Sequence, residues 1–151
     1  MKITDAVVFV TGANRGLGLV LAKEALQRGA KKVYAGMRNT TDFNEVGLIP
    51  IQIDVTDSES IQKAVAACGD VNILINNAGI TKDGLMMRMS EGQWDAVIAV
   101  NLKSAFNFIH ACTPIMMRQK QGSIINMASV VGVHGNAGQC NYSASKAGMI
   151  G

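Results

Sequence analysis

The sequence predicts an α/β fold in which a parallel sheet carries helices on both faces. Three observations support this prediction. A strand-like apolar run, a glycine-rich turn and a helix-like stretch follow one another at the start of the chain. The same alternation of short apolar runs with stretches of helical periodicity then continues to the last residue. Such alternation is typical of crossovers that cover both faces of a parallel sheet.

Length and composition indicate one globular unit, and we expect residues 1–151 to form a single domain. Hydrophobic residues make up 48% of the chain and charged residues 17%, which is a core-rich balance without a disordered segment. The net charge of +3 is spread along the sequence, which argues against nucleic acid as a partner. No apolar stretch is long enough to span a membrane. Three widely spaced cysteines without metal-ligand spacing favour free thiols in the cytoplasm and no metal site.

Five segments are predicted to form strands because they are short, apolar and rich in β-branched residues. The second is a brief run after the first helix, and the third tolerates Pro50 because that residue lies near its start. The five segments are residues 6–10, 32–36, 48–53, 71–75 and 123–127.

Four helices are predicted between and after these strands. The first covers residues 19–26, and the second covers 58–68 after a capping segment, 54–57. Ser90 and Gln93 have the spacing of a capping box and open a long helix that continues to about residue 119. Pro114 is expected to kink or break that helix.

The polar segment 37–47 is predicted to be a turn with a ragged helical piece, and the glycine-rich segment 128–140 to be loop. The last helix begins near residue 141. Right-handed crossovers then place the strands in the order 3-2-1-4-5, which is a doubly wound, Rossmann-like arrangement, flavodoxin-like at this length.

The glycine-rich turn 11–18 is the first indication of function. Glycines at 12, 16 and 18 allow a tight turn, close ligand approach and close packing of the helix on the strand. Backbone N–H groups and the positive end of the helix dipole meet there, which suits a pyrophosphate. Because ligands bind at the carboxyl ends of such strands, the turn and the segments after strands 3, 4 and 5 are predicted to line one rim.

Five sequence elements together resemble the short-chain dehydrogenase/reductase family. They are the glycine turn 11–18, the Asn-Asn-Ala-Gly segment 76–79, Asn101, Ser129, and Tyr142 followed four residues later by Lys146. Within the family, residues 79–151 resemble the bacterial 3-oxoacyl-[acyl-carrier-protein] reductase subgroup, which functions in fatty acid biosynthesis. Residues 1–78 resemble another subgroup, which suggests a chimera joined near the segment 76–79.

The predicted chemistry is the reduction of a carbonyl group. Tyr142 and Lys146 share one face of a helix, where an ammonium favours the phenolate and makes Tyr142 a better proton donor. Ser129 is placed to hydrogen-bond the same substrate oxygen. The resemblance implies that Lys146 also binds the nicotinamide ribose and that Asn101 holds a water linking Lys146 to solvent. Taken alone, Asn101 would be expected to face solvent from within a helix.

The predicted cofactor is NADP(H). The second predicted strand is followed by Met37 and Arg38 without the acidic residue that binds the ribose of NAD. Arg15 lies in the glycine turn, so two arginines are available for a 2′-phosphate. Asp54 approaches the adenine by resemblance, although its position also suits a helix cap. The predicted cofactor-binding residues are Gly12, Asn14, Arg15, Gly16, Leu17, Gly18, Arg38, Asp54, Val55, Asn77, Ala78, Gly79, Tyr142 and Lys146.

Two hypotheses follow for the chain as a whole. The first is an NADP(H)-dependent reductase of a small-molecule substrate, specifically a 3-oxoacyl thioester. The family continues for about another hundred residues after this point, with further strands and a substrate lid that the chain is expected to lack. The second hypothesis is therefore a truncated or engineered half-domain that folds or binds without turnover. We also expect a homo-oligomer through the long helix or the exposed fifth strand.

Overall fold

The computed structural model describes residues 2–151 and contains one parallel, five-stranded sheet with the order β3-β2-β1-β4-β5. This confirms the predicted α/β class and strand order. The central strand β1 pairs with β2 on one side and β4 on the other, so that Phe9 lies opposite Tyr34 and Leu74. The strands are β1 Val7–Thr11, β2 Lys32–Met37, β3 Ile49–Gln52, β4 Ile73–Asn76 and β5 Ser123–Asn126.

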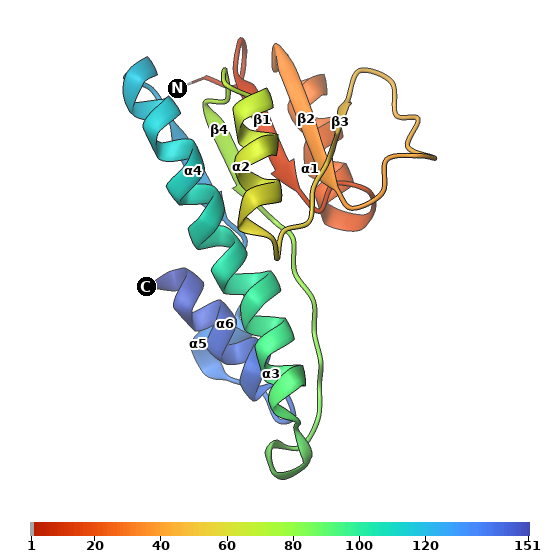
Figure 1. Ribbon diagram of the computed structural model, residues 1–151, viewed down its shortest axis with the longest axis vertical. Helices are drawn as coiled ribbons and strands as arrows, with labels where there is room; N and C mark the ends of the chain where they lie inside the picture. Colours follow the sequence, from red (N-terminus) through yellow and green to blue (C-terminus); the bar gives the residue numbers. More distant parts are fainter. Residues whose placement is uncertain (1) are drawn as a thin grey trace.

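Helices cover both faces of the sheet and also extend beyond it. The sheet lies in the upper half of Figure 1. The long helical segment of α3 and α4 runs beside the sheet and continues below the carboxyl ends of its strands (Figure 1). The chain between β4 and α3 runs downward to the opposite end of the molecule, where α3, α5 and α6 lie (Figure 1). The helices are α1 Gly16–Gln27, α2 Ser58–Ala67, α3 Glu91–Ile98, α4 Ser104–Gln119, α5 Val131–His134 and α6 Cys140–Ile150.

Two apolar clusters hold the helices against the sheet. On one face, Phe9 and Leu74 pack with Ile61 of α2 and Phe108 of α4. The Phe9 and Phe108 ring centroids are 5.6 Å apart, a separation typical of a favourable aromatic pair. On the other face, α1 packs against β1 through small side chains, including Ala22. Because alanine projects so little from a helix, α1 lies close to the strand that precedes it and its N-terminus stays at the carboxyl edge of the sheet.

The helix predicted at residues 19–26 begins earlier, at Gly16, so the last part of the glycine turn is already the first turn of α1. The ragged helical piece predicted within residues 37–47 is absent, and Asn39 instead accepts a hydrogen bond from the Thr41 N–H in a local turn. Such side-chain-to-backbone bonds compete with helix formation. The segment 128–140, predicted to be loop throughout, contains the short helix α5.

The long helix is not broken at Pro114, which lies inside α4. Buried neighbours such as Cys112 and Ile115 keep α4 packed along the sheet, so tertiary contacts compensate for the backbone hydrogen bond that proline removes. The irregularity falls earlier, at a π-helical turn, Ala99–Lys103, that joins α3 to α4. Extra-residue turns of this kind are frequent at functional sites. The capping box of Ser90 and Gln93 at the start of α3 is confirmed.

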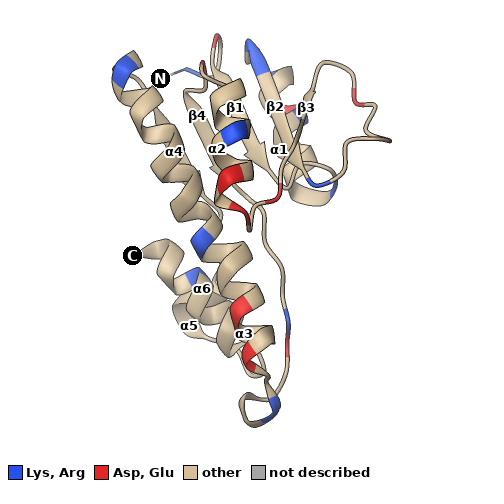
Figure 2. Cartoon of the chain, viewed as in Figure 1, with Lys and Arg blue, Asp and Glu red and all other residues tan. Residues whose placement is uncertain are grey.

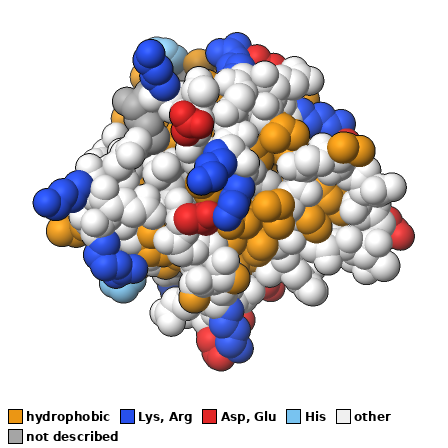
Figure 3. Space-filling view, turned by 90° about the horizontal axis from the view of Figure 1, so that it is seen from above, with side chains coloured by type: hydrophobic (Ala, Val, Ile, Leu, Met, Phe, Trp, Pro, Cys, Tyr) orange, Lys and Arg blue, Asp and Glu red, His pale blue; other side chains and the backbone are white. Residues whose placement is uncertain are grey.

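Lysine and arginine residues are distributed over many elements rather than gathered on one (Figure 2). The face seen from above shows the same scatter, with hydrophobic side chains gathered between the charged ones (Figure 3). Within residues 2–151, no helix combines the length and the apolar character needed to cross a membrane.

Candidate active site

A cleft of about 870 Å³ opens at the carboxyl ends of the central strands. Its lining comes from the glycine turn, the ends of β2 and β3, the segment after β4 and the π-helical turn. The structure therefore brings together twelve of the fourteen predicted cofactor-binding residues. They are Gly12, Asn14, Arg15, Gly16, Leu17, Gly18, Arg38, Asp54, Val55, Asn77, Ala78 and Gly79.

Seven further residues line the cleft that the sequence did not predict. Most of them adjoin a predicted residue, so widening each predicted segment by one position would have included Met37, Asn39, Ile53, Thr56 and Ile80. Gly36 and Val100 are different, because Gly36 lies two positions before Arg38 and Val100 reaches the cleft from the π-helical turn. The additional lining residues are Gly36, Met37, Asn39, Ile53, Thr56, Ile80 and Val100.

The glycine turn lies directly against the segment after β4. A Cβ on Gly18 would stand 2.2 Å from the Gly12 carbonyl oxygen and 2.5 Å from Asn77 Nδ2, so no other residue fits there. Asn77 Nδ2 donates to the carbonyl oxygen of Thr11 at 3.0 Å. This contact fixes the floor of the cleft, because it joins β1 to the turn after β4.

Thr11 has a positioning role that the sequence analysis did not assign. It is buried, and its Oγ1 accepts hydrogen bonds from the backbone N–H groups of Asn77, at 3.0 Å, and Ala78, at 2.9 Å. The same hydroxyl donates to the Ile75 carbonyl oxygen at 3.4 Å. The only sequence signal was its place as the first residue of the glycine turn 11–18.

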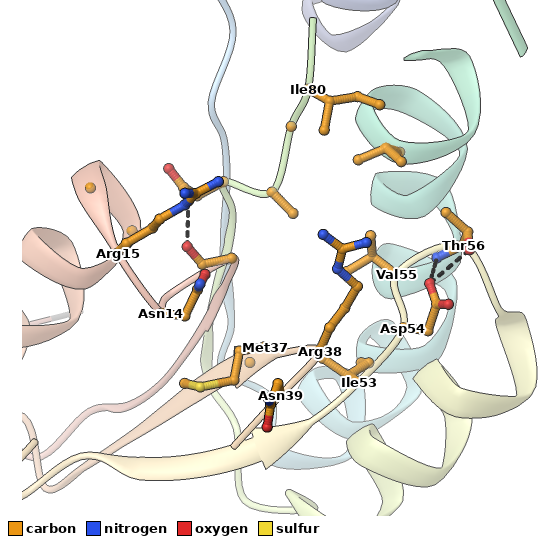
Figure 4. A pocket seen from close by; sticks show the side chains of 18 of the residues that line it. Asn14, Arg15, Met37, Arg38, Asn39, Ile53, Asp54, Val55, Thr56 and Ile80 are labelled. Carbon is orange, nitrogen blue, oxygen red and sulfur yellow. Dashed lines mark hydrogen bonds between the residues drawn. The ribbon is translucent and has the colours of Figure 1, made fainter. Parts of the chain in front are cut away.

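Arg15 and Arg38 are the two cationic side chains in the cleft lining. Both are exposed, and within the described residues neither has a carboxylate oxygen within 4.0 Å. Figure 4 shows the Arg38 guanidinium reaching into the middle of the cleft and Arg15 on the opposite side, beside Asn14. Two unpaired guanidinium groups and a helix N-terminus make the cleft suitable for an anion.

Asp54 does not cap α2. That helix is capped by Asp57, whose side chain accepts from the Glu59 N–H at 2.9 Å, so the cap alternative for Asp54 is wrong. Asp54 Oδ1 instead accepts from the Thr56 hydroxyl at 2.7 Å and the Thr56 N–H at 2.8 Å, as drawn in Figure 4. These bonds, with a smaller contribution from the charge of Arg38, hold the pKa of the Asp54 carboxyl below its usual value. The carboxylate therefore stays charged at the edge of the cleft.

Tyr142 and Lys146 lie on α6, outside the lining of the cleft. Lys146 Nζ is 5.7 Å from the centroid of the Tyr142 ring, so the predicted shared face is present. Lys146 is only 4% exposed, and its ammonium donates to the Met127 carbonyl oxygen. Burial lowers the pKa of Lys146 because desolvation disfavours the charged form.

Ser129 lies between β5 and α5, and its Oγ accepts a hydrogen bond from the Val131 N–H at 3.2 Å. Within residues 2–151 no hydrogen bond joins Ser129 to Tyr142. The two regions are nevertheless neighbours, because a Cβ on Gly132 would stand 2.7 Å from the Lys146 carbonyl carbon. Glycine at this position therefore lets α5 pack directly on α6.

Asn101 is 1% exposed, which excludes the solvent-facing interpretation of this residue. Its Oδ1 accepts from the Ile80 N–H at 2.8 Å, and its Nδ2 donates to the Ile80 carbonyl oxygen and to Ser145 Oγ, both at 3.0 Å. The π-helical turn presents this amide inward. Asn101 thus connects the cleft wall at Ile80 to α6, the helix that carries Tyr142 and Lys146.

Comparison with known proteins gives three consistent results. The family model described as short chain dehydrogenase matches residues 6–151. The chain is 43% identical over 164 aligned positions to a 3-oxoacyl-[acyl-carrier-protein] reductase of Staphylococcus aureus, with 100% of the chain and 66% of that protein covered. A protein of the same description from Thermotoga maritima is 42% identical over the same shares. The chain therefore spans about two-thirds of the length of these curated relatives.

A solved structure also resembles the whole fold. It is a short chain dehydrogenase from Burkholderia cenocepacia in complex with NADP, and it matches with a TM-score of 0.91 and 33% sequence identity. The match covers 99% of the present chain and 64% of that one.

Proposed function

Because the chain belongs to the short-chain dehydrogenase family, we propose that it binds NADP(H) and reduces a carbonyl substrate, with 3-oxoacyl thioesters as the substrate class. One observation carries the cofactor proposal: Arg15 and Arg38 face one cleft beside the glycine turn, and within the described residues neither is paired with a carboxylate. The B. cenocepacia structure contains NADP, which supports the same choice. The names of the S. aureus and T. maritima relatives support the substrate class.

The cleft residues fit a dinucleotide. No atom lies within 4 Å of where a Cβ on Gly16 would stand, which leaves the turn open to close approach by a pyrophosphate, while Gly18 lets the start of α1 pack against Gly12 and Asn77. The N-terminus of α1 would receive the pyrophosphate, and Arg38 with Arg15 would hold the 2′-phosphate by charge-assisted hydrogen bonds. When bound, the nicotinamide supplies the hydride.

The chain's own residues would supply the proton to the carbonyl oxygen. As the carbonyl carbon accepts the hydride, the carbonyl oxygen takes a proton from the Tyr142 hydroxyl. Ser129 Oγ would donate a hydrogen bond to the same oxygen and stabilise its developing charge. Lys146, held near the Tyr142 ring, would favour the resulting phenolate. Asn101 is a positioning residue here, because its bonds to Ile80 and Ser145 hold α6 against the cleft wall.

One observation favours a second candidate, a dinucleotide-binding module without turnover. Tyr142 and Lys146 do not line the cleft, and the Lys146 ammonium is engaged by the Met127 carbonyl oxygen. In that arrangement the cleft could bind a dinucleotide, whereas the Lys146 ammonium donates to the backbone and is not free to act on Tyr142. The junction of two subgroups near the segment 76–79 stays a prediction.

A single-turnover experiment separates the two candidates. The full chain, in excess over NADPH, is mixed with a 3-oxoacyl thioester, and NADPH oxidation is followed beside Tyr142→Phe. Loss of the general acid should slow oxidation by about 10²–10⁴-fold. Tyr34→Phe is the matched control, because Tyr34 donates to Asp70 and lies away from the cleft, at the start of β2.

The outcomes are distinct. Oxidation that depends on Tyr142 but not on Tyr34 supports the reductase. NADPH binding with equal rates for the wild type and Tyr142→Phe supports the module. A chain that binds no NADPH contradicts both candidates.

A further inference from the structure

Three sulfur atoms converge outside the cleft, where the loop before α3 meets the first residue of α6. Cys140 Sγ lies 3.2 Å from Met86 Sδ and 3.5 Å from Met89 Sδ. The two methionines precede Cys140 by 54 and 51 positions in the chain, so folding alone brings these sulfurs together. One thiol and two thioethers form a soft donor set, of the type that selects Cu(I) among biological metal ions.

The two segments that carry the sulfurs are fixed to one another. The Gly84 N–H donates to the Gly138 carbonyl oxygen at 2.8 Å, and Asn141 Nδ2 donates to the Lys82 carbonyl oxygen at 2.9 Å. Asn141 is fully buried, so its side-chain amide is shielded from water in this contact. The donor set is therefore largely assembled before any ion arrives, which reduces the entropy lost on binding.

The cluster is also accessible, whereas the other thiols are not. Met86 is 69% exposed, and Cys140 and Met89 are half-buried. Cys68 and Cys112 are buried, and burial raises their pKa values to about 12 and about 11, which keeps both thiols protonated. Of the three cysteines, only Cys140 combines access to solvent with sulfur neighbours.

We propose that Cys140, Met86 and Met89 form a binding site for a soft monovalent cation of the Cu(I) and Ag(I) class. On binding, the Cys140 thiol loses its proton to solvent and forms a bond to the ion as a thiolate. The two thioether sulfurs complete a three-coordinate site, and no electron is transferred. The charges of thiolate and ion cancel, so the site carries no net charge at this exposed position.

The geometry needs only a small adjustment. Three sulfurs around one ion, at about the 2.3 Å length of a zinc–sulfur bond, stand about 4 Å apart. The measured separations of 3.2 and 3.5 Å from Cys140 must therefore widen slightly. Methionine has three rotatable bonds and adapts easily to such a change.

The test is an anaerobic titration of the full chain with Cu(I) against a chromophoric Cu(I) chelator, repeated with Ag(I) by native mass spectrometry. We expect one ion per chain and one proton released. Cys140→Ser should abolish this binding, and the double variant Met86→Leu/Met89→Leu should weaken it by at least about tenfold. Met87→Leu is the matched control, because Met87 adjoins Met86 in the chain but is 87% exposed and outside the cluster.

Two results would overturn the proposal. The first is a double methionine variant that binds Cu(I) as tightly as the wild type, since Cys140 would then act as an isolated thiol. The second comes from X-ray absorption at the copper edge of the wild-type complex, which does not depend on any variant. Three sulfur neighbours are expected there, and a two-coordinate ion would contradict the site.

Discussion

Arg38 is the side chain on which the proposed preference for NADP(H) depends most directly. It follows β2, where a member of this fold that uses NAD carries an acidic residue. Its guanidinium reaches into the cleft, and Asp54, whose carboxylate faces Thr56, does not neutralise it by an ion pair (Figure 4). A phosphate entering the cleft would therefore meet a cation that no carboxylate within the described residues already occupies.

We predict that Arg38→Ala weakens NADPH binding and leaves NADH binding unchanged. A hydrogen bond to a charged group contributes about 1.5–3 kcal/mol, which corresponds to roughly 10–150-fold in affinity. Fluorescence titration of both cofactors against wild type and variant measures the effect. Arg28→Ala is the control, because Arg28 pairs with Glu24 at the far end of α1. Equal affinities for the two cofactors in every variant would refute the 2′-phosphate assignment.

At the level of single elements, α4 has two faces with opposite roles. Phe108 is fully buried against Phe9 of β1, whereas Phe106, two positions earlier, is 64% exposed. The helical repeat turns the two side chains in different directions, so that one belongs to the core and the other to the surface. The buried face holds α4 on the sheet and thereby sets the direction of the π-helical turn and of Asn101.

This difference predicts unequal effects of the same substitution. Phe108→Ala should lower the free energy of unfolding by about 3–5 kcal/mol, since it leaves a cavity in a packed core. Phe106→Ala should change it by less than about 0.5 kcal/mol, as surface substitutions usually do. Urea denaturation of the two variants measures both values. Similar losses for both would show that α4 does not pack as described.

For the whole molecule, two apolar surfaces are candidates for self-association. One is the outer edge of β5, which pairs with no further strand within residues 2–151 and where Ile124 and Ile125 are 37% and 44% exposed. The other is the outer face of α4, with Phe106 at 64% and Met117 at 72% exposure. An unpaired strand edge offers backbone groups to another chain, and large exposed apolar side chains favour burial against a partner.

We predict a homo-oligomer, measured by light scattering across a concentration series. Ile125→Lys should shift the population toward monomer if β5 forms the interface, and Phe106→Lys should do so if α4 forms it. The replacement places a charge that association would have to desolvate. A wild-type chain that stays monomeric at every concentration would contradict the prediction.

Much of the lining of the cleft could be predicted from the sequence, whereas the arrangement of the proposed catalytic residues could not. Gly12, Arg15 and Arg38 are local features, since each lies at the end of a strand or in the turn that follows, and parallel strands bring their ends to one edge. Asn101 was ambiguous because its role depends on a π-helical turn that turns its amide toward Ile80 and Ser145. Helical periodicity contains no signal for such an insertion.

The sequence by itself determined the α/β class, the strand order and twelve of the residues that line the cleft, because alternation and turn chemistry are encoded locally. Only the tertiary structure decided that Asp57 rather than Asp54 caps α2, and that Pro114 remains within a continuous helix. The same is true of the contact between Cys140 and two methionines more than fifty positions away. In each case the outcome depends on which distant groups compete for a hydrogen bond or a packing site, and that competition exists only after the chain has folded.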